Sequence, residues 1–283
     1  MTTLPLILVT NDDGIASPGL HAAIEAVSDL GELLVIAPLT QQTAASRSFP
    51  PRRGEIVERT IRLSGGREVQ AWALDGSPAQ AVRWGILALA PRQPDLLISG
   101  INYGENIGMS VTVSGTVGAA IEGATFGVPG LAVSLEVEDP SRHLNHSDEV
   151  DFSTARLFLR QFARVMLCTK LPPDVDILKL DVPTNATPTT PWRLTRLSRQ
   201  RVIHSGVHVE NGRKFLQGYY RAFDPETLEH DSDAYAVLVD RVVSLTPLSI
   251  DLTARVDRAH LQSTLKELVR QAETSTVKCS EQA

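Results

Sequence analysis

Short apolar runs alternate with segments of helical periodicity along most of the chain. Residues 6–9 are apolar throughout, residues 20, 24, 27 and 30 repeat at helical spacing, and residues 33–37 form a second apolar run. Ser17 and Pro18 favour a helix start, and Gly31 is placed to end that helix. Continuous apolar runs are typical of parallel strands covered on both faces. The start of the chain therefore predicts a strand, a helix and a second parallel strand.

The same alternation continues to residue 183. Further strands are expected at residues 69–74, 95–99, 129–133 and 177–180, and helices at residues 79–89, 116–126 and 156–167. This order predicts an α/β protein with a Rossmann-like, doubly wound and mostly parallel sheet. The first turn lacks the G-x-G-x-x-G pattern of dinucleotide sites, which argues against a dehydrogenase.

The pattern changes after residue 183. Residues 218–221 and 242–245 are alternating segments that suggest hairpins, and residues 259–272 have the period of a terminal helix. We therefore expect a Rossmann-like core over residues 1–183 and a C-terminal hairpin and helix extension over residues 184–283, which is not an independent domain. Residues 40–68 lack a clean period, and the sequence leaves open whether they form a lid over a site or a surface connection.

Composition narrows the class of protein. The chain has 283 residues, of which 42% are hydrophobic and 21% charged, and these fractions are ordinary for a globular protein. The net charge of -6 offers no broad basic surface, so we expect no nucleic-acid polymer as partner. With neither a signal peptide nor a long apolar run, the sequence predicts a cytoplasmic protein without a membrane partner. Cys168 and Cys279 suggest neither a disulfide framework nor a thiolate metal site.

Two adjacent carboxylates, Asp12 and Asp13, follow the first predicted strand. The carboxyl ends of strands in an open α/β sheet are where ligands bind. Neighbouring carboxylates repel each other, and a divalent cation would neutralise them. The segment Asn11-Asp-Asp-Gly14 is equally compatible with an exposed turn. Taken alone, it leaves both the metal site and the turn open.

A second polar stretch follows the strand at residues 95–99. Asn102 offers an uncharged oxygen ligand that would complete a shell begun by the two aspartates. Ser114, Gly115 and Thr116 place hydroxyl and backbone N–H groups at a helix start, which suits an anion such as phosphate, although a simple helix cap is the alternative. The polar stretches at residues 11–14, 102 and 114–116 follow strands whose ends are expected to meet at one edge of the sheet. One oxygen-rich pocket therefore explains them better than several independent turns.

These motifs, in this order, resemble the SurE family of stationary-phase survival proteins. The matching stretches are Val9-Thr-Asn-Asp-Asp-Gly14, Ala37-Pro38, Asp75-Gly-Ser-Pro78, Ser99-Gly-Ile-Asn102, Asn106-Ile-Gly108 and Ser114-Gly-Thr-Val117, with a weaker match through residues 195–247. The resemblance implies a metal-dependent nucleotidase that hydrolyses nucleoside 5′- and 3′-monophosphates. It also implies one Mg²⁺ or Mn²⁺ per subunit, and a homodimer or homotetramer in which C-terminal elements are exchanged.

Carried over to this chain, the resemblance assigns the site residue by residue. The metal ligands would be Asp12, Asp13, Thr43 and Asn102, of which the two aspartates and Asn102 are also catalytic. The residues that bind substrate and phosphate would be Asn11, Asn106, Ser114, Gly115 and Thr116. Thr43 stands where the family usually has serine, and Ser46 is an alternative ligand. The chain also departs from the family at Lys179 and Asp181, where asparagines are usual, at Gln80, where aspartate is common, and in the segment around Arg47.

Other interpretations remain open from the sequence. An aspartyl-phosphate phosphatase also has an acid at the first strand end, but its usual pattern is Asp-x-Asp rather than two adjacent aspartates. A nucleotide- or metal-binding module that has lost turnover is the non-enzymatic alternative. The pattern assigns no general acid. Further candidates are His204 and His208 at a subunit interface, Arg196, Arg199 and Arg201 for attracting an anion, and Tyr103 and Phe49 for stacking on a base.

Overall fold

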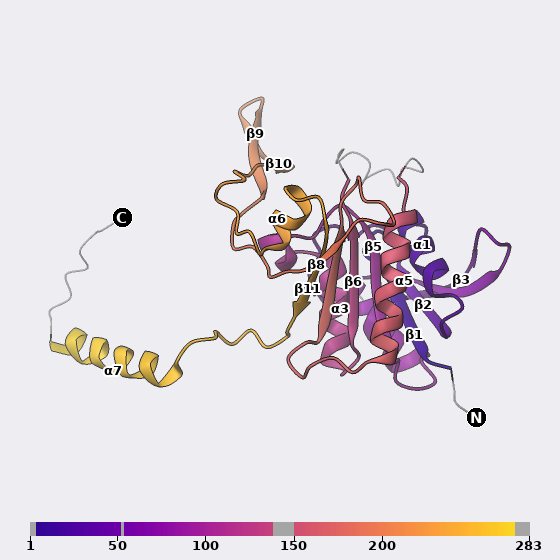
Figure 1. The fold of residues 1–283 in the computed structure, drawn as a ribbon, viewed down its shortest axis with the longest axis horizontal. Coiled ribbons are helices and arrows are strands. Elements are labelled where there is room, and N and C mark those ends of the chain that lie inside the picture. Colours follow the sequence, from indigo (N-terminus) through magenta and orange to yellow (C-terminus); the bar gives the residue numbers. More distant parts are fainter. Residues whose placement is uncertain (1–3, 52–53, 138–149, 275–283) are drawn as a thin grey trace. The chain divides into compact units, whose positions relative to one another are not determined.

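The protein is described from a computed structural model, which covers residues 4–51, 54–137 and 150–274. The chain divides into two units, Met1–Ile250 and Asp251–Ala283. Over the described residues, the first unit contains a nine-stranded sheet of order β3-β4-β2-β1-β5-β6-β7-β11-β8 (Figure 1). Its strands are β1 (Leu6–Thr10), β2 (Glu32–Pro38), β3 (Ile56–Arg62), β4 (Glu68–Leu74), β5 (Leu96–Tyr103), β6 (Gly130–Leu135), β7 (Ile177–Val182), β8 (Trp192–Leu194) and β11 (Val243–Leu248).

The central strands are parallel and buried, which confirms the predicted α/β fold with a mostly parallel sheet. β1 pairs in parallel with β2 on one side and with β5 on the other. All residues of β1, β5, β6 and β7 are buried, as expected for strands covered on both faces. Thr10 lies opposite Ser99 in the register of β1 and β5, so the segments that follow these two strands leave the sheet at the same edge.

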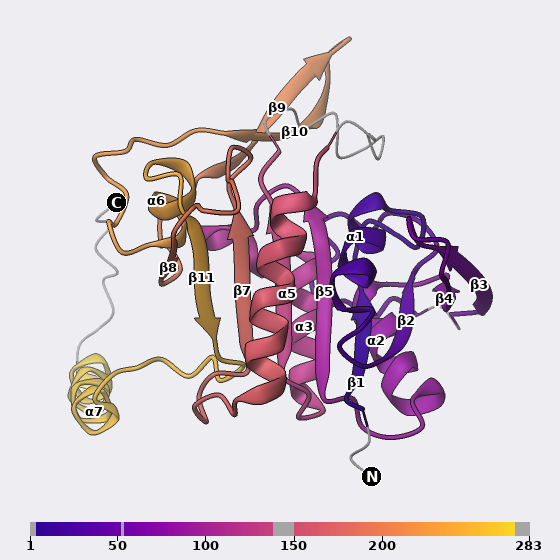
Figure 2. The ribbon, with the colours of Figure 1, turned by 45° about the vertical axis from the view of Figure 1, so that its right-hand side comes forward.

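Helices cover both faces of this sheet (Figure 2). The helices α1 (Pro18–Val27) and α5 (Ser153–Cys168) pack together in the larger apolar core, while α2 (Pro78–Trp84) and α3 (Gly115–Thr125) contact each other on the opposite face. A capping box starts α2, in which Ser77 and Gln80 bond each other's backbone, and a π-helical turn follows over Gly85–Leu89. The predicted helices are thus confirmed, and the one expected at residues 79–89 changes its hydrogen-bond pattern midway.

Residues 40–68 contain a strand that the sequence did not indicate. β3 runs antiparallel to β4 at the edge of the sheet, and most of its side chains are exposed. An edge strand with one polar face has no continuous apolar run, and for this reason the periodicity missed it. The loop that precedes it, residues 39–51, packs against the segment after β1.

The C-terminal third also differs from expectation. β11 pairs antiparallel with β7, and β8 pairs with β11, so the main sheet extends well beyond residue 183. β9 (Ile203–Glu210) and β10 (Arg213–Arg221) form a hairpin separate from the main sheet, and α6 (Asp233–Leu238) packs against β11. The structural division falls after Ile250 rather than at residue 183, because residues 243–248 supply a strand to the core instead of a hairpin.

The second unit contains α7 (Arg258–Thr274), which confirms the predicted terminal helix. Leu261, Leu265, Leu268 and Val269 recur at helical spacing along it and are exposed. No helix among the described residues is long and apolar enough to cross a membrane.

Candidate active site

Asp12 lies against the first turn of α3. Its side chain accepts a hydrogen bond of 2.6 Å from the Thr116 hydroxyl, and the backbone N–H groups of Gly115 and Thr116 also face it. A Cβ on Gly115 would lie 2.7 Å from the Asp12 carboxylate, so only glycine permits this approach. Burial raises the pKa of Asp12 to about 6, although these hydrogen bonds oppose the shift.

Asp13 is held by two different segments. Its carboxylate accepts the Tyr103 backbone N–H at 3.2 Å and the Gln41 side-chain amide at 3.1 Å, and only 2% of the residue is exposed. Burial raises the pKa of Asp13 well above its ordinary value, and the charge of Asp12 raises it further. Both neighbouring carboxylates are therefore costly to ionise in this site.

The oxygen of the Asn102 amide is available for a cation. The Asn102 Nδ2 donates to the carbonyls of Tyr103 at 3.1 Å and Gly104 at 2.8 Å, so the orientation of the amide is fixed. A register shift between β5 and β6 separates Ser99 from Asn102 and changes where this side chain points. The remaining Oδ1 is a hard, uncharged ligand next to the residue that binds Asp13.

The loop after β2 is fastened to the acidic pair through the neighbours of Thr43. The Gln42 N–H donates to the Asp12 carbonyl at 2.7 Å, and Gln41 binds the Asp13 carboxylate. Thr43 itself is exposed. Ser46, the alternative ligand, donates its hydroxyl proton to the Thr112 carbonyl at 3.0 Å, which leaves its oxygen lone pairs able to bind a cation. Thr43 stays the predicted hydroxyl ligand, with Ser46 as the alternative.

The donor set suits a hard divalent cation. It consists of two buried carboxylates and uncharged oxygens, which is the ligand chemistry that Mg²⁺ and Mn²⁺ favour. Within the part of the chain that the structure describes, no group of three or more His, Cys, Asp or Glu side chains is arranged to hold a metal. A cation here would depend on amide and hydroxyl oxygens in addition to the aspartates.

The residues predicted to bind phosphate also make hydrogen bonds within the protein. Ser114 caps α3 by accepting the Val117 N–H at 3.0 Å, and its hydroxyl proton remains to be donated. Thr116 donates to Asp12. Asn11 bonds both the N–H and the carbonyl of Gly14, which shapes the acidic turn. The Asn106 amide donates to the Ser134 hydroxyl at 2.9 Å.

The two aromatic residues predicted as candidates for stacking on a base, Tyr103 and Phe49, both contact other side chains of the chain. Tyr103 is fully buried, with its ring 4.9 Å from that of Phe152 in an edge-to-face contact, so the expectation that it stacks on a base is wrong. Phe49 is 39% exposed, and the Arg83 guanidinium lies 4.0 Å from its ring centre. Both Arg83 and Arg47 pair with the buried Glu122 of α3.

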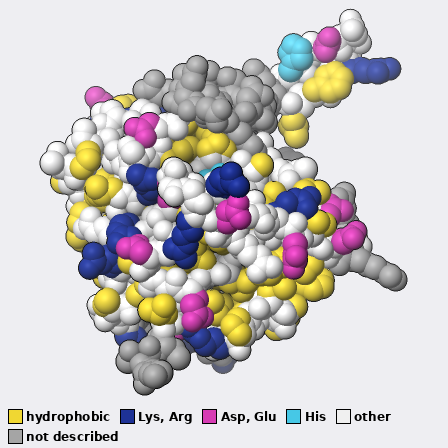
Figure 3. Space-filling model, turned by 90° about the vertical axis from the view of Figure 1, so that its right-hand side faces the viewer, with side chains coloured by type: hydrophobic (Ala, Val, Ile, Leu, Met, Phe, Trp, Pro, Cys, Tyr) yellow, Lys and Arg dark blue, Asp and Glu magenta, His cyan; other side chains and the backbone are white. Residues whose placement is uncertain are grey.

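The other polar candidates lie in the C-terminal part. Arg196 pairs with the exposed Asp231, and His204 contacts the Ala222 carbonyl at 3.0 Å. Neither contact connects these residues to the acidic pair. Charges on the face shown in Figure 3 are mixed, with basic and acidic side chains interspersed.

Sequence analysis did not identify Glu105, a buried carboxylate in the segment that follows β5. Arg221 of β10 pairs with it at 2.6 Å and with Glu136, at the end of β6, at 2.8 Å. Burial raises the pKa of Glu105 to about 7 despite the charge of Arg221. Periodicity gives no signal for such a pair, because Glu105 and Arg221 are distant in the sequence and meet only in the folded chain.

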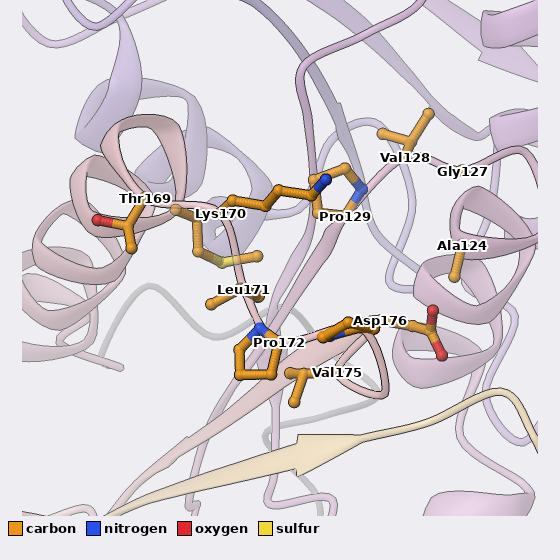
Figure 4. A pocket seen from close by; sticks show the side chains of 12 residues that line it. Ala124, Gly127, Val128, Pro129, Thr169, Lys170, Leu171, Pro172, Val175 and Asp176 are labelled. Carbon is orange, nitrogen blue, oxygen red and sulfur yellow. The ribbon is translucent and has the colours of Figure 1, made fainter.

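A surface depression of about 310 Å³ lies elsewhere (Figure 4). It is lined by residues that precede β6 and β7, among them Pro129, Lys170 and Asp176. The acidic pair follows β1, so the depression and the acidic pair lie at opposite edges of the parallel sheet. The depression is separate from the carboxylates.

Comparisons with known proteins agree with this geometry. The family model described as Survival protein SurE matches residues 7–204. The 5′-nucleotidase SurE of Thermococcus kodakarensis is 43% identical over 260 residues, which are 92% of this chain and 98% of that protein. The protein of the same name from Methanocella arvoryzae is 40% identical, with 92% and 98% covered. The crystal structure of SurE from Aquifex aeolicus covers 94% of this chain and 100% of its own, with a TM-score of 0.71 and 27% identity. The chain belongs to the SurE family.

Proposed function

We propose that this protein is a divalent-metal-dependent 5′-nucleotidase that converts nucleoside monophosphates to nucleosides and phosphate. The observation that carries the proposal is the buried pair Asp12 and Asp13, which is bound by the start of α3 and by the backbone N–H of Tyr103, the residue after Asn102. Relatives named 5′-nucleotidase SurE match almost the whole chain and support the same activity.

The proposed ligands of one Mg²⁺ or Mn²⁺ are Asp12, Asp13, Thr43 and Asn102. When bound, the cation would supply Lewis-acid activation of a phosphate oxygen and of the attacking water. Thr116 and Gly115 orient the Asp12 carboxylate through the contacts described above. Tyr103 and Gln41 do the same for Asp13.

The phosphoryl group would lie between Asn106 and the start of α3. Ser114 has a hydroxyl proton to donate, and the helix start provides a positive dipole end. Preorganised donors of this kind stabilise the charge on the equatorial oxygens during phosphoryl transfer. Asn11 fixes the turn that presents both carboxylates.

A substrate panel tests this function. Phosphate release from nucleoside 5′- and 3′-monophosphates is measured with Mn²⁺, with Mg²⁺ and with chelator, for the natural protein and for Asp13→Asn. We expect metal-dependent release that falls by about a thousandfold in the variant, because one charged ligand is lost. Asp29→Asn is the matched control, since Asp29 pairs with Arg160 between α1 and α5. Full activity in chelator or in Asp13→Asn would refute the metal centre.

The same experiment separates the alternatives. A binding module would bind the nucleotide without releasing phosphate. An aspartyl-phosphate phosphatase would yield a trapped phosphoenzyme on Asp12 or Asp13. The Thr116 hydroxyl and the start of α3 already engage Asp12, which favours a ligand role over a nucleophile role.

We further propose that the chain forms a homodimer or homotetramer through its C-terminal elements. The apolar stripe of α7 and the exposed Val207, Val209 and Leu216 of the β9–β10 hairpin support this proposal. Light scattering on the full chain and on a chain ending at Ile250 tests it, and an equal subunit number in both would contradict a role for α7. The cytoplasmic location and the absence of a nucleic-acid partner stay predictions.

A further inference from the structure

A buried charge cluster lies beneath the loop that follows β5. Lys179 and Asp181 belong to β7, Asp233 starts α6, and all three side chains are fully buried. The Lys179 ammonium pairs with the Asp181 carboxylate and, at 3.1 Å, with that of Asp233. Burial by itself would lower the pKa of Lys179, but the two carboxylates outweigh it and raise this pKa, so the lysine is charged.

The two carboxylates of this cluster hold the backbone of the loop. The Asn106 N–H donates to Asp181 at 2.8 Å, and the Gly108 N–H donates to Asp233 at 3.0 Å. Asp233 also accepts the Ser198 N–H at 2.9 Å. Hydrogen bonds to buried charged groups are among the stronger ones in proteins, so the loop is fixed at two successive points.

The side chain of Asn106 is fixed from the same two strands. Its amide donates to Ser134 of β6, and Ser134 lies opposite Asp181 in the register of β6 and β7. Backbone and side chain of Asn106 therefore both depend on one pair of neighbouring residues. The Asn106 Nδ2 carries two N–H groups, and Ser134 takes one of them, so the second can donate to a phosphoryl oxygen.

We propose that Lys179, Asp181 and Asp233 form a positioning cluster that sets Asn106 for binding the phosphoryl group. This proposal rests on the nucleotidase function proposed above and deepens it. Lys179 lies between two carboxylates that would otherwise repel each other and offsets one of their two charges, and those carboxylates fix the loop. Asparagines, which the family resemblance leads one to expect at 179 and 181, would carry no such charge; in this chain an ion cluster does the positioning.

Asp181→Ala tests the cluster without leaving a lone buried charge, because Lys179 keeps Asp233 as its partner. We expect the KM for the nucleotide and the inhibition constant of inorganic phosphate to rise by about tenfold or more, since small displacements of a positioning group are costly. Mn²⁺ affinity, measured by calorimetry, should stay within about twofold, because Asp181 touches none of the proposed ligands. Asp181→Asn retains one acceptor oxygen and should give intermediate values.

Two further measurements separate positioning from general destabilisation. Leu159→Ala in α5 removes a fully buried side chain of the larger apolar core, which includes neither Asn106 nor Gly108, and serves as a control matched for lost stability. Amide hydrogen exchange at Asn106 and Gly108 should accelerate in Asp181→Ala, most strongly at Asn106, and not in Leu159→Ala. Unchanged exchange at Asn106, or unchanged phosphate inhibition in a folded Asp181→Ala protein, would overturn the proposal.

The exchange measurement also distinguishes the two proposals from each other. If the natural protein releases no phosphate from any nucleotide, the nucleotidase function fails, and the role of the cluster in phosphate binding fails with it. Faster exchange at Asn106 in Asp181→Ala would then still show that Asp181 holds the loop. An active enzyme with unaltered exchange in the variant would refute the cluster alone.

Discussion

Two buried groups of carboxylates in this protein differ in whether a basic side chain lies among them. Asp181 and Asp233 have Lys179 between them, and its charge offsets one of their two negative charges inside the chain. Asp12 and Asp13 are also buried, yet no basic side chain is among the main causes that set the pKa of either. The carboxylates with their own cation hold the structure of a loop, whereas in the proposed function the pair without one would bind a cation from outside.

The variant with the largest expected effect on this difference between the two groups is Lys179→Met. The substitution leaves two buried carboxylates without a cation, so the second region comes to resemble the first. We expect the free energy of unfolding to fall by about 3 to 5 kcal/mol, as is typical when one partner of a buried ion pair is removed. Urea denaturation at neutral pH measures this change. A loss below about 1 kcal/mol would show that the cluster does not need its lysine.

Gly115→Ala tests how closely the first region is fitted. The new Cβ would lie 2.7 Å from Asp12, so the carboxylate or the start of α3 must move. We expect phosphate release to fall by about a hundredfold, with weaker Mn²⁺ binding, because a shift of about 1 Å in a reacting group has effects of this size. Gly65→Ala is the control, since nothing lies within 4 Å of a Cβ built there. Equal activity in both variants would contradict the close fit.

The smallest of the three expected effects is the pH dependence of Mn²⁺ binding, which reports on the protonation of Asp12. The pKa of Asp12 is raised from 3.8 to about 6, so the folded protein without metal loses stability as the pH rises through this range. A cation must displace that proton below pH 6. We therefore expect Mn²⁺ affinity to weaken by about tenfold from pH 7 to pH 5 through Asp12 alone. Calorimetric titrations at several pH values measure it, and a flat profile would contradict the raised pKa.

The sequence predicted the elements whose signal is local. The apolar runs of β1, β2, β5, β6 and β7 and the caps of α2 and α3 predicted the parallel sheet and its helices. Ser17 precedes α1 as predicted, but its side chain makes no cap hydrogen bond. β3 was not predicted, because its exposed face breaks the apolar pattern. β11 was predicted as a hairpin strand, because the sequence does not show which strand it pairs with. Tyr103 was one of two candidates for stacking on a base, but its ring is buried against Phe152.

The sequence by itself determined that two adjacent carboxylates follow the first strand and that a helix start follows a later one. This is possible because the residue types and their order fix which chemistry reaches the carboxyl edge of a parallel sheet. The sequence placed Asn102 in a loop after residue 99, whereas β5 continues through Asn102 to Tyr103. Only the tertiary structure decided that Thr116 orients Asp12, that Tyr103 and Gln41 hold Asp13, and that Asp181 holds Asn106. Those contacts join residues that are distant in the chain, and their burial sets the charges that sequence order cannot reveal.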